Sequence, residues 1–138
     1  MTRRYLLDSG PASDFLFQRR GVDARVEAAR RAGARVGIGA PVLGEIVGGL
    51  EASKSREASW KIARPRLGKL VCWPIDKAAA YEFGRVLAEL KRIGRPMQQI
   101  DIQIAAIAFA LGDCTVVSGD GDLSAVPGLT VENWSSLS

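Results

Sequence analysis

The sequence contains no histidine, and only two of its 138 residues are cysteine. The lack of histidine excludes Ser-His-Asp and Cys-His catalysis, histidine metal sites and histidine pH switches. Cys72 and Cys114 lie far apart, each in an apolar run, so they form neither a CxxC redox pair nor a zinc cluster, and we expect both to be buried thiols. Any chemistry must therefore rest mainly on carboxylates, arginine, lysine and hydroxyl groups.

The sequence also lacks an apolar run of the roughly 20 residues that a membrane helix needs. Its hydrophobic fraction of 47% and charged fraction of 25% are those of a soluble globular protein. Asp8 and Gly10 interrupt the first apolar stretch before it could serve as the core of a signal peptide. We therefore expect a single domain over residues 1–138, placed in the cytoplasm and not in a membrane.

Strand-like and helical patterns alternate along the chain. Apolar runs predict strands at residues 4–8, 35–40, 69–76, 114–120 and 129–134. Helical spacing and end signals predict helices at residues 12–20, 22–33, 41–50, 51–65, 76–94 and 101–112. This alternation predicts an α/β domain with a mostly parallel sheet of about five strands and helices on both faces. In such sheets, ligands bind beyond the carboxyl ends of the strands, at the switch point of the strand order.

Several carboxylates lie at or near the predicted strand ends, where a sheet of this kind binds ligands. Asp8 ends the first predicted strand, and Glu45 is the only charged residue of an otherwise apolar helical segment. Asp101 opens the most apolar helix, and Asp120 and Asp122 follow the fourth strand in the loop SGDGD. The first and fourth strands are expected to be neighbours, which would bring Asp8 and Asp120 to one edge of the sheet together with Asp101.

Each acid also has a structural explanation when it is taken alone. Asp8 is well placed to cap the turn that follows it, and Asp101 to cap its helix. Glu45 lies on the opposite side of its helix from the apolar residues, where exposure to water alone would explain it. A turn alone would explain the SGDGD loop, which lacks the spacing and the final glutamate of an EF-hand.

The joint arrangement of the acids is more informative than any one of them. Several carboxylates within a few ångströms repel each other, and some would be forced to take up protons. A divalent cation removes this conflict. A ligand set of oxygen atoms, without histidine or cysteine, favours a hard ion such as Mg²⁺ or Mn²⁺ over zinc.

Four segments together resemble the PIN-domain family, in particular the VapC-type toxins of bacterial toxin-antitoxin pairs. They are LLD with the helix after it, GEI on a second helix, GRP followed by DIQIAAIAFALG, and VVSGDGDLSAVPGLTVENW. The similarity runs nearly end to end. It implies a parallel sheet flanked by helices and a metal-dependent endoribonuclease that hydrolyses RNA phosphodiester bonds. The residues that match the family's catalytic acids are Asp8, Glu45, Asp101 and Asp120.

The resemblance implies a role for each matched residue. Asp8, Asp101 and Asp120 would hold one or two Mg²⁺ or Mn²⁺ ions, and Glu45 would orient or deprotonate the attacking water. Asp122 matches an accessory acid, and the hydroxyl of Ser9 or Ser118 would hydrogen-bond a ligand carboxylate. The chain departs from the family in two places: many members have Thr-Asn where this chain has Ser9 and Gly10, and Leu123 replaces the usual aromatic residue.

With an RNA substrate, the basic residues are candidates for binding its phosphates. The net charge of +4 and the pI near 9.4 fit a polyanionic partner, although such values are also common in proteins that bind no nucleic acid. Trp60 could stack on a base or simply pack within its helix. For each basic residue, a solvated position on an ordinary helix is as good an explanation as a role in RNA binding. The candidates for an RNA groove are Lys54, Arg56, Lys61, Arg64, Arg66 and Arg95, together with Lys91 and Arg92.

The resemblance also implies partners: a homodimer and a cognate VapB-like antitoxin that blocks the acidic groove. Phe15, Leu16 and Phe17 could serve either interface, but a role in the core is the simpler expectation. Two other functions were considered. A phosphoacceptor receiver domain is disfavoured, since the last strand carries no lysine. A PIN-like module that binds RNA or a protein partner without cutting is the alternative that the Gly10 change keeps open.

Overall fold

The computed structural model describes residues 2–135, so the ends of the predicted domain, residues 1 and 136–138, lie outside the described residues. The strands are β1 (Arg4–Leu7), β2 (Arg35–Gly39), β3 (Val71–Trp73), β4 (Cys114–Val117) and β5 (Val131–Glu132). The helices are α1 (Ser9–Leu16), α2 (Val22–Arg31), α3 (Ala40–Ala52), α4 (Arg56–Leu67), α5 (Lys77–Arg92), α6 (Gln99–Leu111) and α7 (Gly121–Ser124).

The strands form one five-stranded sheet in the order β3-β2-β1-β4-β5, and every pairing is parallel. The strand order reverses between β1 and β4, which are direct neighbours with Leu7 opposite Val117. Both the predicted parallel sheet and the predicted neighbourhood of the first and fourth strands are confirmed. The carboxyl ends of β1 and β4 are therefore the switch point at which a ligand is expected.

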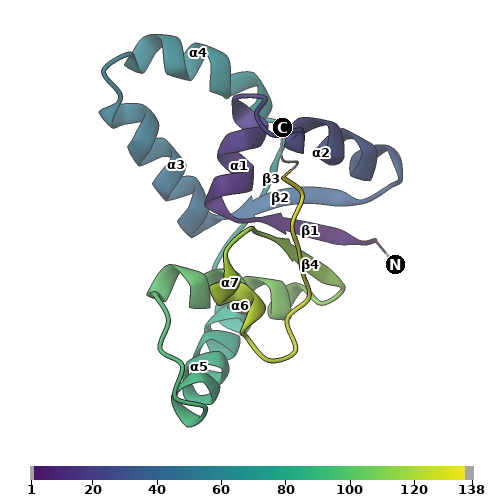
Figure 1. Ribbon diagram of the computed structural model, residues 1–138, viewed down its shortest axis with the longest axis vertical. Helices are drawn as coiled ribbons and strands as arrows, with labels where there is room; N and C mark the ends of the chain where they lie inside the picture. Colours follow the sequence, from purple (N-terminus) through teal and green to yellow (C-terminus); the bar gives the residue numbers. More distant parts are fainter. Residues whose placement is uncertain (1, 136–138) are drawn as a thin grey trace.

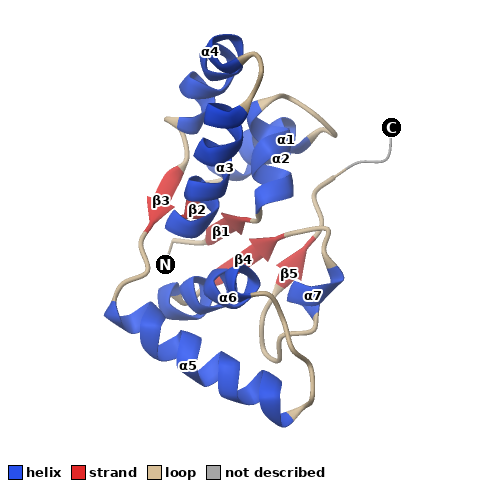
Figure 2. Ribbon diagram, turned by 90° about the vertical axis from the view of Figure 1, so that its left-hand side faces the viewer, coloured by secondary structure: helices blue, strands red, loops and turns tan. Residues whose placement is uncertain are grey.

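Helices cover both faces of the sheet, as predicted. Helices α1 to α4 lie on one side and α5 to α7 on the other, with the sheet between them (Figures 1 and 2). Leu6 and Leu7 of β1 and Val116 and Val117 of β4 are fully buried, because these central strands are covered on both sides. Within the described part of the chain, no helix is long and apolar enough to cross a membrane.

The first helix begins earlier than its pattern predicted. It starts at Ser9 and not at residue 12, because Asp8 caps it: the Asp8 carboxylate accepts a hydrogen bond from the Ser9 backbone N–H at 2.8 Å. It ends at Leu16, and Phe15 and Leu16 are buried in the core. The simpler expectation for these two residues, a place in the core, is confirmed, whereas Phe17 is only partly buried.

The segment predicted as one helix up to Pro65 differs in two ways. The preceding helix α3 continues to Ala52, and a break at residues 53–55 separates it from α4. Helix α4 then passes through Pro65 to Leu67. A proline removes one backbone hydrogen bond from a helix, and α4 continues for only two residues beyond Pro65.

The thiol prediction is wrong for Cys72, which is exposed, while Cys114 is partly buried. Cys72 lies on β3, an edge strand that pairs only with β2. Successive side chains of a strand point to opposite faces, so Trp73 turns inward and Cys72 outward. An apolar run alone does not distinguish such an edge strand from a central one.

Candidate active site

The acids from the two central strands meet at the predicted edge of the sheet. Asp8 directly follows β1, and its backbone N–H donates to the Val117 carbonyl of β4 at 2.9 Å. Asp120 lies three residues beyond the end of β4. Asp101 comes from the first turn of α6, which packs against β4. Three acids that are far apart in the sequence thus reach the same edge.

Ser118 connects the first two of these acids. Its hydroxyl donates to the second carboxylate oxygen of Asp8 at 2.8 Å and accepts from the Asp120 backbone N–H at 2.9 Å. Ser118 itself is buried. Asp8 is therefore fixed through both carboxylate oxygens, one by the Ser9 backbone and the other by Ser118. Of the two hydroxyls considered in the prediction, that of Ser118 hydrogen-bonds the Asp8 carboxylate, while Ser9 contributes its backbone N–H; the role of Asp8 as a metal ligand stays a prediction.

Asp120 and Asp122 are placed by the short helix α7, which the sequence did not predict. Asp120 caps this helix by accepting from the Asp122 backbone N–H at 2.9 Å. Asp122 in turn pairs with Arg95, whose guanidinium lies 2.7 Å from it. One carboxylate oxygen each from Asp101, Asp120 and Asp122 lies within 4.8 Å of the other two, and we call these three residues the acidic triad.

Asp101 is the most perturbed acid of the site. It is only 6% exposed, and it does not cap its helix, because the cap is Gln98 and the helix begins at Gln99. Burial first, and then the negative charges around it, raise the pKa of Asp101 to about 6. The contributing charges, in decreasing order, are those of Asp8, Asp120, Asp122 and Glu45.

Glu45 stands apart from the acidic triad. It lies on α3, is exposed, and contributes the smallest of the charge effects on Asp101. With Ser9 and Arg19 it lines a hollow of about 480 Å³ between α1, α3 and α4. Glu45 therefore faces solvent, as the structural explanation of this residue predicts. Its negative charge is still close enough to Asp101 to raise the pKa of that carboxyl group.

The donor set of the site fits a divalent cation. Every side chain that the acidic triad and Asp8 offer is a carboxylate. Burial first, and then repulsion from the neighbouring carboxylates, raise the pKa of Asp101, and a cation would relieve that repulsion. Hard oxygen ligands are those that bind Mg²⁺, Ca²⁺ and Mn²⁺. The triad also includes Asp122, which the resemblance implied only as an accessory residue.

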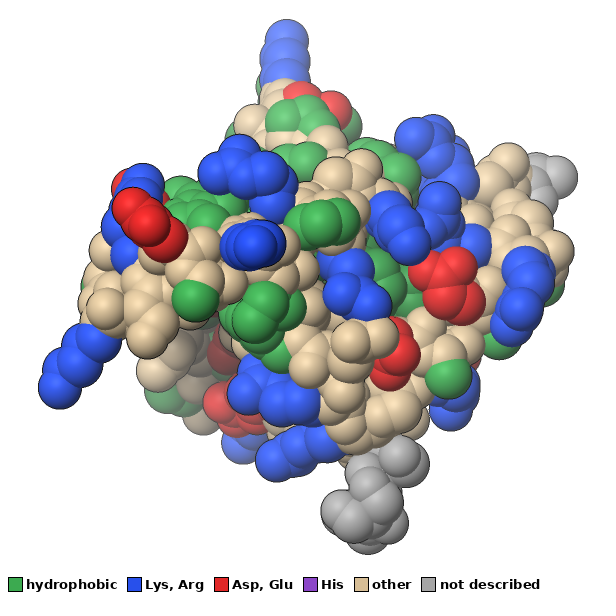
Figure 3. Space-filling model, turned by 90° about the horizontal axis from the view of Figure 1, so that it is seen from above, with side chains coloured by type: hydrophobic (Ala, Val, Ile, Leu, Met, Phe, Trp, Pro, Cys, Tyr) green, Lys and Arg blue, Asp and Glu red, His purple; other side chains and the backbone are tan. Residues whose placement is uncertain are grey.

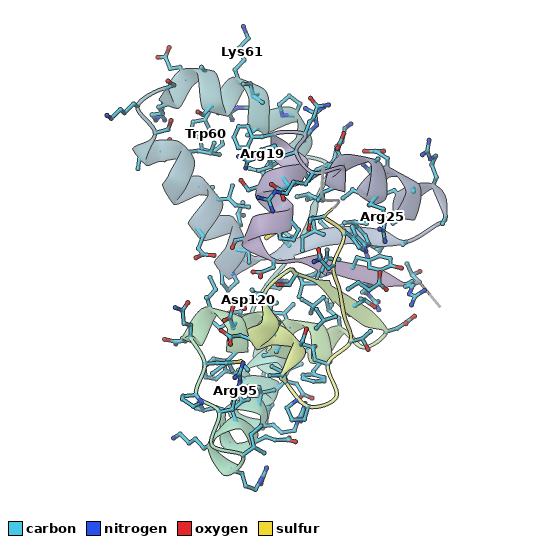
Figure 4. All side chains as sticks on the ribbon, in the orientation of Figure 1. Arg19, Arg25, Trp60, Lys61, Arg95 and Asp120 are labelled. Carbon is cyan, nitrogen blue, oxygen red and sulfur yellow. The ribbon has the colours of Figure 1, made fainter. Side chains whose placement is uncertain are left out.

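The predicted RNA-binding residues fall in two places. Arg95 contacts the acidic triad through Asp122, and Figure 4 shows it close to Asp120. Lys91 and Arg92 end helix α5, shortly before Arg95. The remaining members lie on α4 or just before it, and in the same view Lys61 and Trp60 lie at the far end of the molecule. Figure 3 shows that Lys and Arg side chains are spread over this end instead of forming one dense patch.

Two of the α4 residues already have partners within the arm that α3 and α4 form. Arg56 pairs with Glu51 at 2.7 Å, and the Trp60 indole N–H donates to the same carboxylate at 2.7 Å. The Arg64 guanidinium lies over the Trp60 ring, 4.8 Å from its centre. Lys54 and Lys61 are exposed, and Arg66 is partly buried. The pairing of Arg95 with Asp122, across 27 positions, left no signal in the sequence.

Comparison with known proteins agrees with this geometry. The PIN domain family matches residues 5–129. The tRNA(fMet)-specific endonuclease VapC of Shigella flexneri is 32% identical over 98 residues, which cover 71% of this chain and 74% of that protein. The corresponding VapC of Salmonella typhimurium is 29% identical over 100 residues, or 72% of this chain and 76% of that protein.

A solved structure has the same fold. The structure of VapBC2 from Rickettsia felis bound to a DNA fragment from its promoter aligns with a TM-score of 0.87, covering 95% of this chain and 98% of that chain at 22% identity. The sheet order and the acids at its carboxyl edge define an α/β protein with a parallel five-stranded sheet and an acidic site at its switch point. The chain belongs to the PIN domain family.

Proposed function

We propose that this protein is a metal-dependent endoribonuclease and the toxin of a VapBC-type toxin-antitoxin pair. The observation that carries the proposal is the meeting of Asp8 and the acidic triad at the switch point of the sheet. The named activity of the VapC relatives supports RNA, and transfer RNA in particular, as the substrate. With such a substrate, we propose that the protein acts in the cytoplasm.

Asp8, Asp101 and Asp120 are the proposed ligands of Mg²⁺ or Mn²⁺, with Asp122 as an additional carboxylate of the triad. When bound, such an ion lowers the pKa of water and neutralises charge on the phosphoryl oxygens. In the in-line hydrolysis, a bond forms between the water oxygen and phosphorus while the phosphorus–oxygen bond to the leaving nucleotide breaks.

The chain's own residues supply orientation and proton transfer. Glu45, exposed on α3 at the rim of the site, is the proposed base that orients or deprotonates the attacking water. Ser118 holds the Asp8 carboxylate in one orientation, so that no side-chain rearrangement is needed when a ligand arrives. Ser9 fixes the other Asp8 oxygen through its backbone N–H.

The basic residues are proposed to bind the RNA backbone. Arg95 lies beside the acids, where it would meet the phosphate nearest the cleaved bond. Lys54, Arg56, Lys61, Arg64 and Arg66 on the α4 arm would neutralise more distant phosphates, with a salt-dependent affinity. The relatives of known structure are VapBC complexes, and on this likeness we propose a VapB-like antitoxin partner and a homodimer.

The experiment that tests the proposal is cleavage of transfer RNA by the purified protein in Mg²⁺, in Mn²⁺ and in EDTA. Initiator transfer RNA would be compared with elongator species. We expect metal-dependent cutting that Asp8→Asn abolishes. The matched control is Asp113→Asn, the same chemical change at an exposed aspartate just before β4, at the other end of that strand.

A second measurement separates cutting from binding. Mn²⁺ should raise the melting temperature of the wild type and of Asp113→Asn, but much less that of Asp8→Asn. If no RNA were cut while this pattern still held, the metal site would stand and the protein would be a non-cleaving PIN-like module. Cutting that persisted in Asp8→Asn would overturn the catalytic assignment.

A further inference from the structure

A second hollow adjoins the acids on the side away from Glu45. It has a volume of about 370 Å³, and two of its wall residues, Asp8 and Asp120, also belong to the proposed catalytic site. The hollow is also lined by Gly10, Arg20, Asn133 and Ser135. Its volume falls in the range of small-ligand sites, roughly 300–1,000 Å³.

The hollow lies beyond the carboxyl ends of three adjacent strands. Asp8 follows β1, Asp120 follows β4, and Asn133 directly follows β5. This is the place where parallel sheets bind ligands. An RNA strand whose phosphate lies at the acids must leave that point on both sides, and this hollow offers room on one of them.

The Asn133 side chain is held in a defined orientation. Its amide oxygen accepts hydrogen bonds from the Ser135 backbone N–H at 3.0 Å and from the Ser135 hydroxyl at 2.8 Å. A backbone N–H can only donate, so the oxygen end of the amide faces Ser135 and the nitrogen end faces the other way. The nitrogen lies over Gly119, where an added Cβ would be 3.7 Å from it. The exposed amide group is therefore a preoriented hydrogen-bond donor at the hollow.

The charges of the wall restrict what the hollow can hold. Three of the wall residues are carboxylates and one, Arg20, is a cation; Asp14 pairs with Arg19 at 3.4 Å, and Asp8 and Asp120 are the proposed metal ligands. Beyond the metal, the wall therefore offers little positive charge to hold a second phosphate. A neutral ring with hydrogen-bond acceptors for Asn133 and with N–H groups for the carboxylates fits this set of partners.

We propose that this hollow binds the base of the nucleotide next to the phosphate at the acids, with Asn133 as the donor that recognises the base edge. This inference rests on the proposed function. Bases of single-stranded RNA are recognised in this way, by hydrogen bonds to their edges together with stacking on flat side chains such as the arginine guanidinium. Arg20 is exposed in the loop that closes the hollow.

Two variants remove the site by different routes. Asn133→Ala deletes the donor. Gly10→Leu fills the hollow from the α1 side, where a Cβ meets no atom within 4 Å, so the larger side chain enters without a backbone clash. The matched control is Gly48→Leu, at a helical glycine on α3 that is equally open. Mn²⁺-dependent melting shifts should remain in all three variants.

The probes are a short single-stranded RNA and an abasic ribose-phosphate chain of the same length. Binding of both is measured by fluorescence anisotropy in EDTA, and cleavage of the RNA in Mn²⁺. We expect Asn133→Ala and Gly10→Leu to weaken RNA binding and kcat/KM by about tenfold, the scale of one or two lost base contacts. Their affinity for the abasic chain should stay at the wild-type level.

The outcomes separate this inference from the proposed function. If the wild type cuts RNA and both variants bind and cut it equally well, the base site is overturned and the nuclease stands. If the wild type does not cut, yet prefers RNA over the abasic chain and both variants lose that preference, the base site stands without the nuclease. An equal loss of affinity for both probes would also overturn it, since that pattern indicates a backbone contact.

Discussion

The Ser118 hydroxyl joins Asp8 to Asp120 across the two central strands. It donates to the Asp8 carboxylate at 2.8 Å and accepts from the Asp120 backbone N–H at 2.9 Å. Ser118 directly follows β4, whose parallel register places Val117 opposite Leu7. The register of the sheet therefore brings the two acids within reach of one hydroxyl, and the fold and the site depend on the same pairing.

Replacing Ser118 with alanine tests this link. Ser118→Ala leaves one Asp8 oxygen and the Asp120 N–H without their partner, which should lower the free energy of unfolding by about 1–3 kcal/mol. RNA cleavage and Mn²⁺ affinity should fall by about 10- to 100-fold, the usual effect of losing a residue that orients a ligand. Ser124→Ala, an exposed serine of α7, is the control in calorimetry and cleavage assays. Unchanged Mn²⁺ affinity in Ser118→Ala would show that Asp8 does not depend on this bond.

The buried carboxylate of Asp101 predicts an unusual pH dependence of stability. Its pKa is raised from 3.8 to about 6, so the folded state binds a proton that the unfolded state has already released. The carboxyl therefore lowers stability progressively as the pH rises from about 4 to 6, and fully above 6. Asp101→Asn, which keeps the shape and cannot ionise, should raise the free energy of unfolding by about 3 kcal/mol at pH 8 in EDTA, at ~1.4 kcal/mol for each pKa unit.

Thermal or urea unfolding at pH 4 and pH 8 would measure this effect. The difference between Asp101→Asn and the wild type should be small at pH 4 and largest at pH 8. Saturating Mn²⁺ at pH 8 should reverse the order, because only the wild type gains its stabilisation. A constant difference at both pH values would show that repulsion among the acids does not control the stability of the site.

Sequence reasoning reached most of the fold because local patterns determine most of it. The alternation of strands and helices and the end signals specified the parallel sheet, and the switch-point rule placed Asp8 beside Asp120. The features that could not be predicted from the sequence depend on contacts between distant segments. The pairing of Arg95 with Asp122 and the outward face of Cys72 on an edge strand follow only from the assembled sheet. The helical pattern alone places the start of α1 at residue 12, whereas the Asp8 carboxylate caps a helix that begins at Ser9.

Arg95 should affect metal and RNA binding in opposite directions. Its guanidinium lies 2.7 Å from Asp122, beside carboxylates that attract a cation. Arg95→Gln removes a positive charge from this region, so Mn²⁺ affinity should rise by about two- to tenfold. RNA should bind more weakly, because a phosphate contact is lost, and the slope of affinity against salt should decrease by about one unit. Isothermal titration with Mn²⁺ and anisotropy over a salt series measure the two effects, with Arg31→Gln, at an exposed arginine that ends α2, as the control. A parallel loss of both affinities would instead make Arg95 a residue that only holds Asp122 in place.

The glycines provide a test of the packing that supports the site. A Cβ at Gly37 of β2 would overlap the carbonyl oxygen of Val71 on the neighbouring strand β3. Gly37→Ala must therefore push β3 away from the sheet, and we expect it to lower the free energy of unfolding by about 2–4 kcal/mol, the range of severe overpacking. Gly48→Ala is the matched change on α3, where a Cβ meets no atom within 4 Å, and it should stabilise the protein by about 0.5–1 kcal/mol through helix propensity. Urea unfolding of both variants measures these opposite signs.

Because β3 is remote from Asp8 and the acidic triad in the strand order, Gly37→Ala protein that remains folded at low temperature should still bind Mn²⁺ with wild-type affinity. A loss of Mn²⁺ binding by folded Gly37→Ala protein would mean that the edge strand also determines the geometry of the acids.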